Sequence, residues 1–257
     1  MKTARTDLDH TRSLLANTGF EFVPEIIPEL IERGIREDMS HRDFLELVLT
    51  REHDSREERR VRTNLRLSGL PTGKTIEEFD FTFQRGIEKR RMELLSTCEF
   101  ARNRENVLFL GPPGVGKTHL AAGLGVRAIQ NGFSVSYMTA DELIDRLRRD
   151  NGHSHRSRNQ RKKYMRSSVL IIDELGFQAM TREDAHLLFK VISYRYEKGS
   201  TIITSNKSIR EWPDMLAGDE VLATALLDRL LHHCNVVNID GRSFRLRQIE
   251  EKIPKAE

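Results

Sequence analysis

The sequence predicts an α/β fold, in which helices cover both faces of a five-stranded parallel sheet, preceded by a small all-helical domain. From Asn106 onward, short apolar runs alternate with helical patterns. A glycine-rich motif joins the first of these runs to a helix, whereas the first 70 residues have apolar positions at helical spacing only. We therefore expect a helical domain over residues 1–70 and an α/β domain over residues 71–257.

The predicted helical domain has two apolar stripes. Residues 26, 27, 30 and 31 form the first stripe, and residues 44, 45, 48 and 49 form the second. Ser40, with Asp43 three residues later, has the pattern of a helix-start capping pair. Between Arg51 and Arg66, six arginines alternate with four acidic residues, which is typical of an exposed helix face with ion pairs. Contact with DNA is the alternative interpretation of this stretch.

The α/β domain contains five expected strands, which cover residues 107–110, 135–138, 169–172, 201–204 and 236–239. Helical patterns follow these runs, starting near Lys117, Ala140 and Arg182, and the last ends near His233. Helix-start signals precede two of these helices, namely Thr139 with Glu142 and Thr181 with Asp184. The turn-forming segment 70–73 marks the predicted boundary between the two domains.

The composition is that of a globular protein. Hydrophobic residues make up 38% of the 257 residues, and the longest apolar runs are far shorter than the ~18 residues of a membrane-spanning helix. The N-terminus lacks the apolar core of a secretory leader, and Cys98 and Cys234 are too few for a disulfide framework. These features predict a cytoplasmic protein with no membrane partner.

A phosphate-binding motif connects the first expected strand to the helix after it. Residues 111–118 fit G-x-x-x-x-G-K-[ST], in the strand–loop–helix context that this motif requires. The glycines let backbone N–H groups point at phosphate oxygens, Lys117 reaches the β- and γ-phosphates, and Thr118 is placed to ligate Mg²⁺. The predicted nucleotide-binding residues in this loop are Gly111, Pro112, Pro113, Gly114, Val115, Gly116, Lys117 and Thr118.

Another segment imitates this motif. Thr72-Gly-Lys-Thr75 repeats the Gly-Lys-Thr sequence, but Ser68 stands where the first glycine should be and no strand precedes it. We therefore assign residues 72–75 to the linker.

Two further strand ends supply polar groups for chemistry on a nucleotide. Asp173 and Glu174 follow the strand 169–172, at the sheet edge where ligands of open α/β sheets bind. Asp173 is expected to hold Mg²⁺ and Glu174 to act as the general base for water attacking the γ-phosphate; a loop start or helix cap is the alternative interpretation. Asn206 ends the next strand and is expected to orient that water. Ile209 stands where a guanine-reading Asn-Lys-x-Asp signature has Asp, so specificity for GTP is not predicted.

The histidines do not predict a metal site. His119, His232 and His233, even with Cys234, lack a separated pair of partner ligands in the sequence. We expect them to have helix-packing or surface roles.

These motifs, in segments 111–122, 170–176, 204–206, 226–233 and 241–247, resemble those of the IstB-type transposition helper ATPases. This family belongs to the AAA+ clade of P-loop NTPases, which also contains DnaC-type helicase loaders and the initiator DnaA. The resemblance implies a Mg²⁺-dependent ATPase without a C-terminal helical lid domain. It also implies that the segment 78–81 lies beside the adenine. Phe79 and Phe81 of this segment, together with His119 directly after the phosphate-binding motif, are thereby added to the expected nucleotide-binding residues.

The resemblance also assigns two arginines. Arg229 lies where the family has an arginine finger, which enters the neighbouring subunit's site and stabilises charge there. A homo-oligomer formed through the ATP sites is therefore implied. Without the resemblance, Arg229 is interpreted as a surface residue paired with Asp228. Arg245 corresponds to the second sensor arginine, with Arg242 and Arg247 as nearby alternatives.

Residues 146–166 contain nine Lys or Arg residues and one Asp, an excess of +8 in a chain whose net charge is +3. Such a segment is expected to neutralise DNA phosphates without reading bases, and a solvated charge run is the alternative. The predicted DNA-binding residues are Arg148, Arg149, Arg156, Arg158, Arg161, Lys162 and Lys163.

The function expected from these observations is that of an ATP-dependent helper protein. It is expected to oligomerise on double-stranded DNA with ATP and Mg²⁺ and to assist a separate transposase encoded by the same element in target selection and strand transfer. A DnaC-like replicative helicase loader is the main alternative, and a small-molecule kinase is a weaker one, because nothing in the sequence resembles an acceptor pocket or closing lid.

Overall fold

Three helices form the N-terminal part of the chain: α1 (Lys2–Asn17), α2 (Val23–Arg36) and α3 (His41–Ser68). The computed structural model describes residues 2–150 and 164–250. By its internal contacts the chain divides into two compact units, residues 1–63 and 64–257. The division falls within α3, and the domain boundary predicted at residue 70 lies just beyond the end of this helix.

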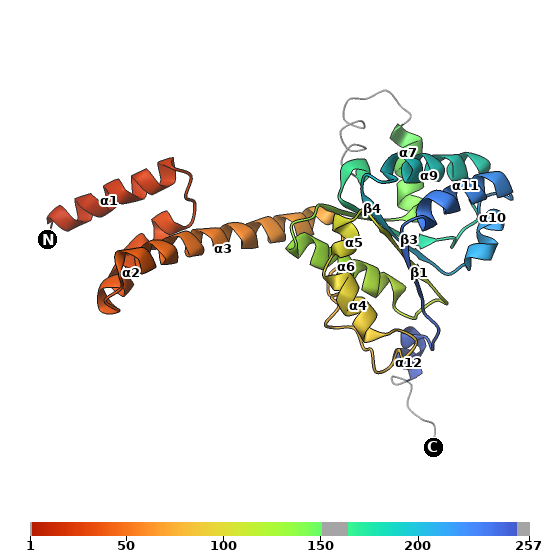
Figure 1. Ribbon diagram of the computed structural model, residues 1–257, viewed down its shortest axis with the longest axis horizontal. Helices are drawn as coiled ribbons and strands as arrows, with labels where there is room; N and C mark the ends of the chain where they lie inside the picture. Colours follow the sequence, from red (N-terminus) through yellow and green to blue (C-terminus); the bar gives the residue numbers. More distant parts are fainter. Residues whose placement is uncertain (1, 151–163, 251–257) are drawn as a thin grey trace, which may run out of the picture. The chain divides into compact units, whose positions relative to one another are not determined.

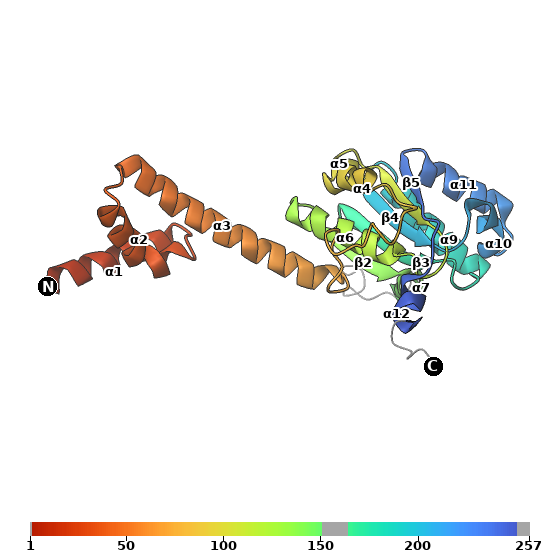
Figure 2. The ribbon, with the colours of Figure 1, turned by 90° about the horizontal axis from the view of Figure 1, so that it is seen from below.

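The N-terminal unit has its own small core. Val23, Ile27 and Leu30 of α2 are buried against Val48 of α3, and Leu15 of α1 packs against this group. Figure 2 shows the three helices. Both predicted apolar stripes therefore lie on helices, as expected. The Ser40 hydroxyl accepts a hydrogen bond from the Asp43 backbone N–H at 3.2 Å, which confirms the predicted capping pair at the start of α3.

A buried carboxylate from α3 caps the start of α2. Glu52 is 4% exposed and accepts hydrogen bonds from the backbone N–H groups of Glu21, Phe22 and Val23 at 2.8–2.9 Å. Burial acts to raise the pKa of Glu52, but these bonds and the neighbouring Arg56 outweigh it and lower the pKa to about 2. The sequence predicts an exposed helix face around Glu52, but in the structure this carboxylate is buried and its hydrogen bonds join α3 to the start of α2.

Five parallel strands form the sheet of the second unit, in the order β2-β3-β4-β1-β5. The strands are β1 (Asn106–Leu110), β2 (Val135–Thr139), β3 (Val169–Leu175), β4 (Ser200–Ser205) and β5 (Cys234–Asn238). Each contains most or all of a predicted run, so the five-stranded parallel sheet is confirmed. β1 lies between β4 and β5, so the loop after it reaches the sheet's carboxyl edge beside the end of the central strand β4.

Helices cover both faces of this sheet (Figure 1). On one face lies α6 (Lys117–Gln130), with α4 (Lys89–Ser96) and α5 (Glu99–Arg102) near it. The other face packs against α7 (Ala140–Asp150), α9 (Arg182–Arg195) and α11 (Glu220–Leu231) in one apolar core. Shorter elements are η1 (Ile209–Glu211), α10 (Trp212–Met215) and α12 (Phe244–Glu250). None of the described helices is long and apolar enough to cross a membrane.

Successive residues of a strand point to opposite faces, so a strand covered on both sides needs a continuous apolar run. Leu108, Leu170 and Ile172 face the core shared with α7, α9 and α11. Ile171 faces α6, where its side chain lies against Gly125. This two-sided burial explains why the strands read as continuous apolar stretches in the sequence.

A buried arginine holds two strands at their amino ends. Arg195, at the end of α9, is 2% exposed and donates hydrogen bonds to the backbone carbonyls of Met165, Ser167 and Ser200 at 2.6–2.9 Å. Burial lowers the pKa of Arg195 to about 10, so the guanidinium is still charged at neutral pH. The carbonyl groups therefore take the place of water around this cation.

Candidate functional site

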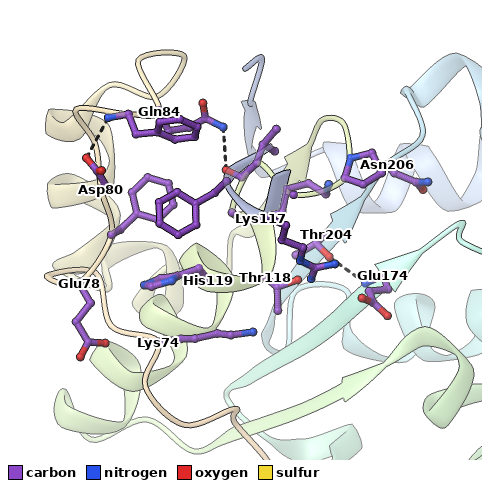
Figure 3. A pocket seen from close by; sticks show the side chains of 18 of the residues that line it. Lys74, Glu78, Asp80, Gln84, Lys117, Thr118, His119, Glu174, Thr204 and Asn206 are labelled. Carbon is purple, nitrogen blue, oxygen red and sulfur yellow. Dashed lines mark hydrogen bonds between the residues drawn. The ribbon is translucent and has the colours of Figure 1, made fainter. Parts of the chain in front are cut away.

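A hollow of about 290 Å³ opens at the carboxyl edge of the sheet (Figure 3). Its volume is at the lower end of the range for small-molecule sites. Segments far apart in the sequence meet around it, including the loop after β1 and the ends of β3 and β4. The predicted site residues that line it are Phe79, Pro113, Gly114, Val115, Gly116, Lys117, Thr118, His119, Glu174, Asn206 and Arg245.

The loop between β1 and α6 has the backbone geometry of an anion cradle. Gly116 has a φ of +96° and immediately precedes the first turn of α6. A Cβ atom at this position would lie 2.5 Å from the ring of Phe79, so both the backbone angle and the space require glycine. The free N–H groups at the start of α6 and the helix dipole favour a phosphate here.

Lys117 points along this loop. Its ammonium group donates hydrogen bonds to the carbonyl oxygens of Gly111 at 2.7 Å and Pro112 at 2.8 Å. Burial lowers the pKa of Lys117, and the neighbouring Asp173 carboxylate opposes this effect. The ammonium is thus held at the phosphate loop by groups that an anionic ligand can replace.

Asp173 lies beneath the hollow at the end of β3 and is 1% exposed. Its carboxylate accepts hydrogen bonds from the hydroxyls of Thr118 at 3.0 Å, Tyr137 at 2.6 Å and Thr204. Burial and the hydrogen bond to Asp173 raise the pKa of Tyr137 far above its usual range, so this hydroxyl remains a donor. These contacts fix the carboxylate next to the Thr118 hydroxyl.

A β-bulge places Glu174 differently from Asp173. β3 pairs with β4 at Ile172 and again at Leu175, while β4 advances only from Ile203 to Ser205; β3 therefore has one extra residue here. Glu174 takes a φ of +61°, and its backbone N–H donates to the Thr204 hydroxyl at 2.9 Å (Figure 3). As a result Asp173 is buried, whereas Glu174 is exposed and lines the hollow.

Asn206 and Arg245 approach the hollow from β4 and α12. Within the part of the chain that the structure describes, the buried Oδ1 atom of Asn206 has no hydrogen-bond partner. A buried amide oxygen without a partner calls for a ligand or water. Arg245 contributes to lowering the pKa of Lys117, so two cationic groups act on the same space. An oligophosphate ligand would neutralise the two cationic groups, and a water molecule beside it would supply the donor that the Asn206 amide oxygen lacks.

Comparison with known proteins agrees with this geometry. The family model for IstB-like ATP binding proteins matches residues 14–252. The chain belongs to this IstB-like family. An insertion sequence IS21 ATP-binding protein of Pseudomonas aeruginosa is 43% identical to it over 91% of this chain and 88% of its own length. The corresponding protein named for insertion sequence IS5376, from Geobacillus stearothermophilus, is also 43% identical, over 85% of this chain and 86% of its own length.

Solved structures confirm the AAA+ fold of this IstB-like protein. The DnaC helicase loader superposes with a TM-score of 0.56 at 23% identity, over 66% of this chain and 98% of its own. DnaA from Aquifex aeolicus bound to AMPPCP has a TM-score of 0.50 at 23% identity, over 72% of this chain and 56% of its own. At this level of identity the likeness concerns the fold.

Apart from the DNA-binding set, five predicted site residues do not line the hollow of the IstB-like chain, namely Phe81, Arg229, Gly111, Pro112 and the buried Asp173. Phe81 does not line it; its ring packs against Phe79 with centroids 4.8 Å apart. Of the two rings expected beside the nucleotide, Phe79 is the one that lines the hollow. Arg229 lies on α11, donates to the carbonyl of Ala225 at 2.8 Å and stacks over Phe189 at 4.9 Å. Among the described residues it forms no ion pair with Asp228.

The alternatives for the sensor arginine are separated by position. Arg245 lines the hollow, whereas Arg242 and Arg247 do not. Arg247 stacks over Phe83 at 5.0 Å and lies 3.7 Å from the Asp80 carboxylate. Of the three arginines, Arg245 is thus the one positioned to contact a bound ligand.

Most of the predicted DNA-binding residues of the IstB-like chain lie outside the described residues; these are Arg156, Arg158, Arg161, Lys162 and Lys163. The other two are at the end of α7. Arg149 is exposed. Arg148 donates two hydrogen bonds to Asp184, at 2.8 and 2.7 Å, so its charge is already paired within the protein.

Several residues near the site were not predicted from sequence. Lys74, from the Gly-Lys-Thr segment assigned to the linker, lines the hollow, and the Thr75 carbonyl is 2.7 Å from Nε2 of His119. Since a carbonyl only accepts, this nitrogen carries the proton. Tyr137 and Thr204 hold Asp173, and their polar groups at the carboxyl ends of buried strands were the signal available in the sequence.

Proposed function

We propose that this IstB-like protein hydrolyses ATP. The single observation that carries the proposal is that Lys117, at the start of α6, and Glu174, at the end of β3, line one hollow beside Asp173. Backbone N–H groups of the loop and Lys117 hold the phosphates, and Arg245 adds a second positive charge. The carboxylate of Glu174 accepts the proton of the attacking water, which the Asn206 amide oxygen orients by accepting a hydrogen bond.

Thr118 and Asp173 are suited to hold magnesium. Their side-chain oxygens are 3.0 Å apart, and a hydroxyl with a carboxylate is a donor set that a hard divalent cation prefers. When bound, Mg²⁺ would supply positive charge to the β- and γ-phosphate oxygens.

We further propose that the site is completed by a second copy of the chain. Arg229 is outside the hollow of its own chain and is half-buried on the surface of α11. In this position it acts in trans, where its guanidinium stabilises the charge on the transferred phosphoryl group of a neighbouring subunit. ATP then serves as the link between subunits.

The proposed biological role is assistance to a separate transposase on duplex DNA. Relatives at 43% identity are named as ATP-binding proteins of insertion sequences, and the segment 146–166 has a charge excess of +8. We infer that a row of such segments in the oligomer neutralises phosphates along a duplex. Because Arg148 is paired with Asp184, Arg149 and the residues after it carry this interaction.

The hydrolysis proposal is tested with Glu174→Gln. We expect this variant to bind ATP with wild-type affinity and to lose hydrolysis by a factor of ~10² or more, because general-base catalysis typically contributes 10²–10⁴-fold. Steady-state phosphate release and equilibrium binding of a fluorescent ATP analogue measure the two quantities. Glu183→Gln, at an exposed position on α9, is the matched control. Normal turnover by Glu174→Gln would refute the base assignment.

The DNA proposal is tested by sedimentation with and without ATP. We expect ATP-dependent assembly of the Glu174→Gln protein on a long duplex. Assembly only on a single-stranded oligonucleotide would instead favour a helicase loader. ATP hydrolysis that is indifferent to DNA and stimulated by a metabolite would favour a small-molecule kinase.

A further inference from the structure

Three side chains that bind metals in other proteins meet on the surface of the α/β unit. Glu197 follows α9, whereas His232 and His233 lie between α11 and β5. One possible ligand atom from each lies within 4.8 Å of the others, and all three residues are exposed. The sequence predicts no metal role for the histidines, because it shows no separated partner ligand. Folding supplies that partner, because α9 and α11 pack side by side in one core (Figure 1).

Neighbouring groups hold this cluster in place. The hydroxyl of Tyr196 lies 2.9 Å from Nδ1 of His232, which leaves the other ring nitrogen for a ligand. A hydrogen bond of this kind to the second ring nitrogen commonly orients metal-binding histidines. The ring centroids of His232 and His233 are 4.1 Å apart. On the other side, the backbone carbonyl of Glu197 accepts a hydrogen bond from Arg104 at 2.8 Å.

The donor set selects the class of metal. Cys234 follows the histidines directly, but its thiol is not among the ligand atoms that meet here. The set is therefore two imidazoles and one carboxylate. This combination suits Zn²⁺ and related transition metals, whereas Mg²⁺ and Ca²⁺ prefer oxygen donors alone.

We propose that Glu197, His232 and His233 form a binding site for a transition-metal ion of the zinc class, with water in the fourth position. Ligand atoms around tetrahedral zinc are about 3.4 Å apart, given metal–ligand distances near 2.0–2.1 Å. Small rotations of these exposed side chains bring them to that spacing. Arg104 and Arg229 line the adjoining hollow with His233, and their positive charges reduce the affinity, so we expect a Kd on the order of micromolar.

A bound metal would connect the chain after α9 to the turn after α11. Phe189 lies on α9 and Arg229 on α11, and these two side chains stack on each other. The metal would therefore restrict the helix pair that presents Arg229. This consequence rests on the proposed role of Arg229 in trans, whereas the metal site itself does not.

The test uses untagged full-length protein without nucleotide. Titration calorimetry with ZnCl₂ is expected to give one tight ion per chain, and Co²⁺ is expected to give the visible absorption of a four-coordinate ion. His232→Ala and His233→Ala are each expected to weaken Zn²⁺ binding by at least ~10-fold, and Tyr196→Phe by up to ~10-fold because it only orients His232. His186→Ala, an exposed histidine on α9 outside the cluster, is expected to leave the affinity unchanged.

The triple variant Glu197→Gln, His232→Ala, His233→Ala decides the proposal. Unchanged Zn²⁺ affinity in this variant would place the ion elsewhere, for example at His153 and His155, which lie outside the described residues, and would overturn the proposal. The absence of binding to the wild-type protein would overturn it equally. ATP binding by the triple variant confirms that it is folded. Neither result bears on the Glu174→Gln test, so the two proposals fail independently.

Discussion

Asp173 accepts hydrogen bonds from three hydroxyl groups, and one of them also organises the residue next to it. The Thr204 hydroxyl donates to Asp173 and accepts from the Glu174 backbone N–H. A single side chain from β4 thus positions both acidic residues of β3. In the proposed mechanism one of these acids holds magnesium and the other removes a proton, so their relative geometry depends on Thr204.

Thr204→Val should therefore reduce ATP hydrolysis much more than ATP binding. The shape of the side chain is kept while both hydrogen bonds are lost, and removal of such supporting groups typically costs 10–100-fold in activity. We expect kcat to fall by ~10–100-fold and the Kd for ATP to change by less than about threefold. Thr224→Val is the control, because its hydroxyl donates only to the Glu220 carbonyl one turn earlier. A change in Kd equal to that in kcat would contradict the assignment.

A comparison of Gly116 with Gly132 separates the steric effect of a side chain in the phosphate loop from the strain that alanine causes at a positive φ. Both have positive φ, +96° and +89°, so alanine is strained at either position. At Gly116 an added Cβ meets the Phe79 ring at 2.5 Å, whereas nothing lies within 4 Å of one at Gly132. We expect Gly116→Ala to abolish ATP binding and Gly132→Ala to lower only the melting temperature. Equilibrium ATP binding and thermal unfolding distinguish the two effects.

At the scale of elements, the contact between α2 and α3 includes one buried, ionised side chain, that of Glu52, beside its apolar core. Glu52→Gln should destabilise the N-terminal unit by about 1–3 kcal/mol, because the amide leaves some of the three buried N–H groups without an acceptor. Faster hydrogen exchange in residues 21–52 of the full chain, with unchanged exchange in the sheet, is the expected result. Glu57→Gln is the control, since Glu57 is only partly buried and is paired with Arg60.

The same carboxylate predicts a pH dependence. The pKa of Glu52 is about 2 in the folded chain against an ordinary value of 4.5, so the folded state favours the charged form. Its contribution to stability is full above pH ~4.5 and is lost as the pH falls toward ~2. As the pH falls over this range, the amides of α2 should therefore lose protection from exchange, measured against unprotected amides at the same pH, in the wild type and much less in Glu52→Gln. Equal losses of protection in both proteins would exclude Glu52 as the source.

The elements of the α/β unit followed from the sequence to a large extent. Continuous apolar runs identified all five strands, because β1, β3 and β4 are buried on both faces and the edge strands keep part of that pattern. The capping box of Thr181 with Asp184 marked the start of α9 as predicted. No helix was predicted over residues 2–17, because α1 contributes little to the core and its apolar residues are few. The spacing of apolar residues does not predict a helix that buries only a small face.

The site could be predicted only in part, for a related reason. The phosphate loop is a contiguous motif, so its residues were found by spacing alone. By contrast, the contacts of Tyr137 and Lys74 with this region depend on which strands and loops become neighbours, which periodicity does not encode. The bulge that exposes Glu174 is likewise set by pairing with β4. Residue roles that depend on register are thus visible only after folding.

At the scale of the whole molecule, the proposed finger predicts complementation between two inactive variants. Glu174→Gln lacks the base but keeps Arg229, and Arg229→Ala keeps an intact pocket. We expect each variant alone to lose hydrolysis by ~10² or more. A random equimolar mixture should recover about a quarter of wild-type activity, the chance that an intact pocket meets an intact arginine in a symmetric ring. Phosphate release at a fixed total concentration measures the recovery.

The control for this experiment is a mixture of Glu174→Gln with the double variant Glu174→Gln, Arg229→Ala, which contains no intact pocket. It should remain inactive at every ratio. If the equimolar mixture of the single variants were also inactive while both proteins still assembled with ATP, Arg229 would act within its own chain or would have only a structural role.

The extra residue at the end of β3 also bears on how such proteins diverge. Loss of one codon between Ile172 and Leu175 would remove the irregularity in pairing with β4 and leave room for only one acid at this edge. The phosphate loop, on a different strand, would be unaffected. Under the proposed chemistry, a single in-frame deletion would convert a protein that hydrolyses its bound ATP into one that binds ATP without hydrolysing it. The difference between turnover and permanent retention of ATP is therefore a single residue of β3 in this fold.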